Sequence, residues 1–219
     1  MNSKLYLLII VFFCCNVAIA QKVLNEATLS YEIMVVSPNS PSAKKLLEGS
    51  VLNVYIKGEK SRTDVVSNLG TESAIYNSKL AKGAILKEYS GQKLIITLTK
   101  ENWEDKSRLF RNLKFTIANE SKDINGFNCK KAQSTLEDGD KLEVYFATDM
   151  ALNNNDYNNS FYGLPGIPVQ YEIKSGEIVF KYTLKNINYD VVPFSTFEIP
   201  KFGYRVLNYE DAMQLRRGS

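Results

Sequence analysis

Carboxylates are the only side chains of this sequence that could serve as a general acid and base. The chain contains no histidine, which excludes Ser-His-Asp and Cys-His catalysis as well as histidine-ligated zinc. Paired carboxylates, as in glycoside hydrolysis, remain. Most acidic residues fall in turns or on solvent-facing strand positions, so a carboxylate-dependent hydrolase is the weakest of the functions considered. The acidic residues available for such a pair are Glu26, Asp64, Glu88, Asp138, Asp140, Asp149 and Asp156.

Two other segments match ligand-binding motifs only in part. Asp149 and the asparagine-rich run 153–159 offer oxygen ligands for calcium, but their spacing fits no EF-hand loop. Gly163 and Gly166 precede a strand and are accompanied by prolines, so they cannot open a helix on a phosphate. We therefore interpret residues 153–159 as a solvated loop, and we expect no metal, no cofactor and no enzymatic activity.

The first twenty residues have the form of a cleaved secretory signal. Lys4 supplies the positive start, residues 5–15 form an apolar run without charge, and residues 18–20 form a small-x-small cleavage site. The apolar run is shorter than the ~20 residues that a membrane-spanning helix needs. We expect export to the periplasm or the medium, with residues 21–219 as a single β domain.

Cys129 is the only cysteine that remains after cleavage, because Cys14 and Cys15 lie in the signal segment. A lone cysteine cannot form an internal disulfide, so the mature fold must rest on its core. Lys130 and Lys131 lie beside it and could lower the pKa of the thiol. We favour the other interpretation, a small buried residue on a strand whose neighbouring lysines face outward.

The charge balance argues against a nucleic-acid partner. With 27 basic and 24 acidic residues the net charge is only +3, whereas nucleic-acid-binding domains show a basic patch or stripe. No run of like charges indicates an acidic tail or a polybasic membrane anchor.

Alternation of apolar and polar residues predicts many short strands. Residues 28–36 place Leu29, Tyr31, Ile33 and Val35 on one face. Such strands with regular turns and little helix favour an antiparallel, mainly β domain. The other extended segments expected are 51–57, 60–67, 72–76, 84–89, 93–99, 115–118, 126–132, 141–148, 169–173, 178–184 and 202–207, with short helices at 42–48 and 101–112.

Three local signals refine this prediction. Asp138-Gly139 lies between two alternating runs and predicts a tight hairpin. In the strand 60–67, the two-residue period places Arg62 and Asp64 on a shared face. After Leu184 the apolar face slips by one residue near Asn186, so that Ile187 takes up the pattern, which predicts a β-bulge.

Inward-facing aromatic and aliphatic residues are the candidates for a binding surface. The chain has 13 tyrosines and 11 phenylalanines. In a sandwich these rings would fill the core, whereas in an open or half-closed barrel they would line a cavity for an apolar ligand. The sequence leaves both options open. The residues expected to line a groove are Phe146, Tyr171, Phe180, Tyr182 and Leu184.

Residues 161–173 combine two glycines and two prolines with the start of a strand. Gly163 and Gly166 would give the backbone conformational freedom. Pro165 and Pro168 lack an N–H donor and belong at a strand entry or a bulge. We interpret this stretch as a corner that directs Tyr171 inward and shapes the rim of a groove.

The same stretch resembles the signature of the GLPGLI family, exported Bacteroidetes proteins of unknown function, on residues 162–168. The segments 57–64, 124–132, 143–149 and 197–204 are similar to a related exported group with the same order of parts. That group is similar to the half-barrel fold of the lipoprotein carrier LolA. The resemblance implies a strongly curved antiparallel sheet around a hydrophobic groove, and carries no catalytic residues.

The sequence therefore favours an exported, non-enzymatic protein that binds a lipid, a lipoprotein or another apolar ligand on the concave face of a curved sheet. Peripheral association with the envelope would fit this function. The alternative is an envelope structural or interaction module with a filled core, which would act through exposed loops such as residues 153–159.

Overall fold

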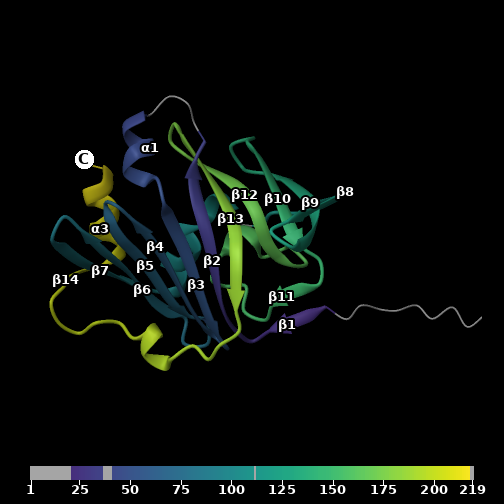
Figure 1. Cartoon of the computed structure of the whole chain (residues 1–219). Helices are drawn as coiled ribbons and strands as arrows, with labels where there is room; N and C mark the ends of the chain where they lie inside the picture. The colour runs from purple at the N-terminus through teal and green to yellow at the C-terminus, as the bar shows by residue number, and fades with distance from the viewer. Residues whose placement is uncertain (1–20, 37–40, 111, 218–219) are drawn as a thin grey trace, which may run out of the picture.

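A large, curved antiparallel sheet dominates the computed structural model, which describes residues 21–36, 41–110 and 112–217 (Figure 1). The predicted signal segment lies outside the described residues. The strands are β1 (Lys22–Leu24), β2 (Glu26–Val35), β3 (Ser50–Lys57), β4 (Lys60–Ser67), β5 (Gly70–Asn77), β6 (Lys82–Tyr89), β7 (Gln92–Leu98), β8 (Thr116–Ile124), β9 (Phe127–Thr135), β10 (Lys141–Ala147), β11 (Met150–Leu152), β12 (Ile167–Ser175), β13 (Ile178–Asn188) and β14 (Arg205–Leu207).

The helices are short and few. The α-helices of the described residues are α1 (Pro41–Leu47), α2 (Lys100–Lys106) and α3 (Tyr209–Arg217), and the 3-10 turns are η1 (Arg108–Phe110), η2 (Asn159–Phe161) and η3 (Phe194–Phe197). The expected fold class, a mainly β protein with a strongly curved antiparallel sheet and a few short helices, is confirmed. No helix within the described residues is long and apolar enough to cross a bilayer.

Two runs of neighbouring strands meet at the pair β2–β13. The sheet order is β14-β7-β6-β5-β4-β3-β2-β13-β12-β10-β9-β8. Most neighbours in the sheet are also neighbours in the chain, as expected for hairpins. Two pairs are parallel, β14 with β7 and β1 with β11. The sequence prediction missed this feature, because such pairs join segments that are distant in the chain and leave no local turn signal.

The structure confirms several local predictions and extends others. The hairpin strand 60–67 is β4, and the predicted bulge near Asn186 appears as a register shift between Leu184 and Asn186 in the pairing of β13 with β2. The predicted final element at 202–207 is the short β14, and the helix α3 after it was not expected.

Both faces of the sheet are covered around β5, β6 and β7. On the inner face, which also carries Tyr31, buried residues of these strands pack with Trp103 of α2 and Tyr209 of α3. On the outer face, Ile75, Ala84, Leu86 and Ile95 pack with Val192 and Phe197. Burial on both sides explains why these strands read as continuous apolar runs instead of a clean alternation.

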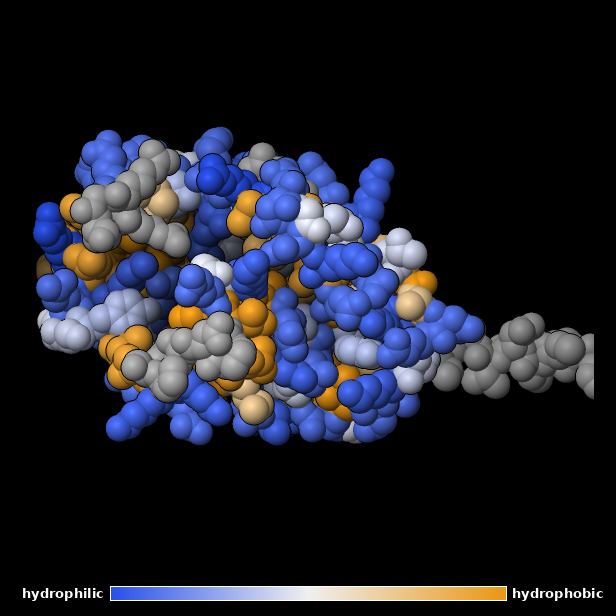
Figure 2. Space-filling model, turned by 90° about the horizontal axis from the view of Figure 1, so that it is seen from above, coloured by the Kyte–Doolittle hydropathy of each residue, from blue (hydrophilic) through white to orange (hydrophobic). Residues whose placement is uncertain are grey.

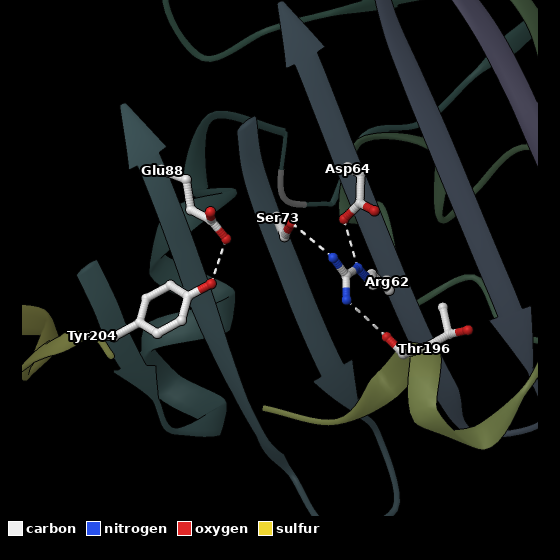
Figure 3. A network of polar contacts seen from close by, with 6 residues as sticks. All are labelled: Arg62, Asp64, Ser73, Glu88, Thr196 and Tyr204. Carbon is white, nitrogen blue, oxygen red and sulfur yellow. Dashed lines mark hydrogen bonds and ion pairs between the residues drawn. The ribbon is translucent and has the colours of Figure 1, made fainter. Parts of the chain in front are cut away.

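A strap, residues 190–204, lies across the outer face and is fixed by charged side chains. The Arg62 guanidinium contacts the Asp64 carboxylate at 2.6 Å and donates to the Thr196 carbonyl at 3.0 Å (Figure 3). Farther along the strap, the Tyr204 hydroxyl donates to the Glu88 carboxylate. The predicted shared face of Arg62 and Asp64 is thus confirmed, and it serves to hold the strap.

The start of the strap is held in the same manner. The Glu26 carboxylate accepts from the Val192 N–H at 2.6 Å, and the Lys57 ammonium donates to the Val192 carbonyl at 2.9 Å. Lys57 also pairs with Glu26 at 2.5 Å. Two of the acidic residues considered for catalysis, Glu26 and Glu88, therefore bind the strap to the sheet.

We expect the strap to loosen in acid. The hydrogen bond from Lys57 lowers the pKa of Glu26, and that from Tyr204 lowers the pKa of Glu88. Their contribution is present above the unfolded-state value, about 4.3, and is lost as pH falls through the lower folded-state pKa. Hydrogen exchange, corrected for intrinsic rates, should accelerate in residues 192–204 below about pH 4 and before β2 and β13 open. Simultaneous opening of strap and strands would contradict this expectation.

Candidate functional site

The five residues predicted to line a groove share one face and one core. Phe146, Tyr171 and Leu184 are fully buried in the main cluster, and Phe180 and Tyr182 are half-buried against it. The rings of Tyr171 and Tyr182 stack with centroids 4.8 Å apart. The prediction that Tyr171 points inward is confirmed.

The interior against these residues is filled by the segment between β11 and β12, residues 152–164. Its side chains Leu152, Tyr157, Phe161 and Leu164 are buried in the same cluster. Phe161 packs edge-to-face on Tyr171 at 4.6 Å. The chain thus supplies its own apolar cover for this half of the inner face.

Buried tyrosines connect this cover to the sheet. The Tyr31 hydroxyl donates to the Pro168 carbonyl at 2.8 Å. Desolvation by burial raises the pKa of Tyr31, Tyr157 and Tyr171. Their hydroxyls therefore stay neutral at physiological pH and act as positioning groups within the core.

The asparagine-rich loop is held in place by specific hydrogen bonds. The Asn154 side chain donates to the Gly58 carbonyl at 2.9 Å and accepts from the Asp156 N–H at 3.0 Å. The Trp103 indole of α2 donates to the Asp156 carbonyl at 2.9 Å. The structure thus replaces the expected solvated loop with a segment fixed to both the β3–β4 turn and α2.

Two cavities flank Tyr162 in this cover. One, the α2 cavity, has a volume of about 530 Å³. The other, the polar cleft, has a volume of about 420 Å³. Both lie within the range of about 300–1,000 Å³ that small-molecule sites occupy. The α2 cavity is lined by Glu104, Ser107, Asn112, Leu113, Lys114, Tyr162 and Gly163, and the polar cleft by Gly58, Glu59, Ser78, Asn153, Asn154, Asn155, Asp156 and Tyr162.

The surface seen from above combines apolar and polar areas. Figure 2 shows orange hydrophobic side chains gathered in the hollowed middle of the molecule, bordered by blue hydrophilic ones. Exposed apolar surface beside a polar border is typical of ligand or partner contacts.

The candidate carboxylates are scattered over the fold. Asp64 pairs with Arg62, and Asp140 pairs with Lys174 at 3.3 Å. Asp156 lies in the polar cleft together with Glu59, which was not among the predicted candidates because a turn residue gives no signal for a distant partner. In the part of the chain that the structure describes, no three metal-ligating side chains come together.

The glycines of the 161–173 stretch have a different role from the one predicted. Neither Gly163 nor Gly166 is among the residues with positive φ. Gly166 is required because a Cβ there would lie 2.0 Å from the Ala147 carbonyl oxygen. The prediction for Pro168 is confirmed: it lies at a register shift between β10 and β12.

Cys129 is a buried residue on β9, as favoured from the sequence. It is 2% exposed, and its thiol donates to the Phe127 carbonyl at 3.2 Å. Desolvation by burial raises the pKa of the thiol to about 11. Lys131 faces the carboxylate of Glu143 at 3.0 Å instead of the thiol.

Comparison with known proteins gives similarities of structure alone. No family model matches the chain, and a search of curated proteins finds no match. PNGF-II is 13% identical with a TM-score of 0.49, covering 87% of this chain and 33% of its own. An uncharacterized conserved protein from Thermus thermophilus is 8% identical with a TM-score of 0.48, covering 83% and 90%. The Mycobacterium tuberculosis lipoprotein LppX is 9% identical with a TM-score of 0.35, covering 75% and 88%.

This chain thus spans about a third of the length of PNGF-II. No activity, ligand or partner is carried over from these similarities.

Replacing Gly166 with alanine should destabilise the protein by about 2–4 kcal/mol, because the added methyl group meets the Ala147 carbonyl and forces β10 and β12 apart. Urea unfolding measures the change. Gly163→Ala is the matched control: its Cβ would lie 3.0 Å from the Leu113 carbonyl, so a smaller loss is expected. Equal losses for the two variants would contradict the close-approach explanation.

Cys129 should resist iodoacetamide at pH 8 in the folded protein and react after unfolding in urea, because burial both shields the thiol and keeps it protonated. Mass spectrometry of the alkylated protein measures the extent of reaction. Since the raised thiol pKa favours the folded state below the unfolded value of about 8.5, this contribution should be lost as pH rises toward 11. Rapid alkylation of the native protein would contradict the assignment.

Proposed function

We propose that this chain is an exported, non-enzymatic periplasmic protein that binds a lipid, a lipoprotein or another apolar ligand at the inner face of its curved sheet. The α2 cavity is the observation that carries the proposal. Its wall residue Leu113 also packs on the main core cluster, so a ligand there lies one side chain away from the apolar interior. The resemblance of residues 162–168 to the GLPGLI signature supports export and a Bacteroidetes origin.

The half-buried rings offer apolar contact without unfolding the core. Ile173, Phe180 and Tyr182 pack against the main cluster but are not fully covered. Burial of each ligand methylene contributes about 0.8 kcal/mol, so a short acyl segment suffices for measurable binding. In this arrangement Phe180 and Tyr182 touch the ligand, and Phe146, Tyr171 and Leu184 form the layer beneath.

A longer chain requires movement of the 152–164 segment. Phe161 and Leu164 occupy the place against Tyr171 that a deeply bound acyl chain would take. Displacing them exchanges one set of apolar contacts for another, which limits the energetic cost. The segment therefore acts as an internal substitute for the ligand.

The alternative function, an envelope interaction module, is favoured by a specific observation. Apolar side chains are exposed along the strap and the following strand: Val191 is 78%, Phe194 62%, Phe202 88% and Val206 62% exposed. Such residues on one face are typical of protein contacts. With the inner face filled, this outer surface would carry the function.

Leu113→Glu should weaken binding of a fluorescent fatty acid at least about tenfold, because the carboxylate places charge in the α2 cavity. Leu109→Glu is the matched control, since Leu109 is 44% exposed on η1 and outside the cavity lining. Native mass spectrometry of protein purified from its own envelope should show a bound apolar ligand. Repeated absence of such a ligand, with a co-purifying protein that Phe202→Ser removes, would favour the alternative.

A further inference from the structure

The polar cleft has a lining that matches hydroxyl groups. Asn153 and Asn155 each offer an amide that donates and accepts, and Ser78 offers a hydroxyl group. Glu59 and Asp156 add carboxylate acceptors. Sugar hydroxyl groups both donate and accept, so this mixed set can satisfy several of them at once.

The charges of the cleft exclude an anionic ligand. Its lining contains two carboxylates and no lysine or arginine. Within the described residues, none of the ion pairs involves Glu59 or Asp156. Both carboxylates are therefore available to accept hydrogen bonds from a neutral ligand, whereas a phosphate or carboxylate would be repelled.

Tyr162 supplies an apolar wall at the mouth of the cleft. Its side chain is 68% exposed, although it lines both cavities. A flat aromatic ring can pack against the C–H face of a pyranose ring, which removes apolar surface of both from water. The combination of one ring with surrounding amides and carboxylates fits a molecule that has one apolar face and a polar edge.

The cleft is preorganised for binding. Asn154 is 7% exposed and joins the loop to the Gly58 carbonyl, and Trp103 fixes the Asp156 carbonyl. On the opposite wall the Ser78 hydroxyl donates to the Glu59 carbonyl at 3.3 Å. Because these contacts already order the backbone, a ligand meets little additional entropy cost.

We propose that the polar cleft binds a neutral sugar ring, as part of a free oligosaccharide, a lipid-linked glycan or a protein-linked glycan. The volume of about 420 Å³ suits one small molecule or a short segment of a glycan. The site is separate from the apolar site proposed above, and it does not depend on that function.

A panel of neutral and acidic glycans tests the proposal with the mature protein. Neutral trisaccharides of glucose, mannose and N-acetylglucosamine should bind with dissociation constants on the order of 0.1–1 mM by titration calorimetry, and acidic glycans should bind more weakly. Tyr162→Ala and Asn155→Ala should each weaken binding about tenfold or more. Phe202→Ala, an exposed aromatic outside the cleft, is the matched control and should leave the affinity unchanged.

Further arms separate the sources and the rival explanations. Vesicles containing a neutral glycolipid and a glycopeptide, compared at equal sugar concentration, identify which carrier adds affinity. The Leu113→Glu variant should retain sugar binding, which distinguishes this site from the apolar one. Cleavage of the glycans that Glu59→Gln abolishes would keep the ligand class and overturn the non-enzymatic part of the proposed function.

Three outcomes would overturn the inference. The first is no binding of any neutral glycan at about 10 times the expected dissociation constants. The second is unchanged affinity in both Tyr162→Ala and Asn155→Ala. The third is binding of Ca²⁺ alone, lost in Asp156→Asn, without binding of any sugar.

Discussion

The inner face of the sheet carries apolar side chains that must be kept from water, and this requirement determines which segments cover it. Tyr31, Tyr171 and Leu184 lie on that face and are buried. At about 25 cal/mol for each Å² of apolar surface, leaving them exposed would cost more than a marginally stable fold can tolerate. Residues 152–164 cover one half of the face, and α2 and α3 cover the other.

A cover made of loop and short helix brings backbone polar groups into the interior, and each needs a hydrogen-bond partner. Asn154, Trp103 and Tyr31 supply partners to Gly58, Asp156 and Pro168. The cover does not fit the sheet and its neighbours without gaps, and both cavities lie at its margins around Tyr162. The candidate sites consequently belong to the cover, whereas the sheet acts as the rigid support beneath it.

The predictions from sequence succeeded where the information is local. Period-two alternation located β4, and the phase slip at Asn186 located the bulge in β13. The predictions were incomplete where contacts join distant segments: β1 pairs with β11, β14 pairs with β7, and α3 packs on the inner face. The role of Gly166 was also misassigned, since its constraint is the neighbouring carbonyl of Ala147 and not its own φ angle.

The sequence by itself determined the fold class, the face on which Tyr171 and Leu184 lie, and the exclusion of histidine chemistry, because these follow from residue type and from the two-residue period of a strand. It also identified Cys129 as a residue with a structural role. Only the tertiary structure decided that the inner face is filled by residues 152–164, and that Glu59, Asp156 and Tyr162 border one cleft. Such contacts depend on how three distant turns pack against each other, and no local pattern encodes that arrangement.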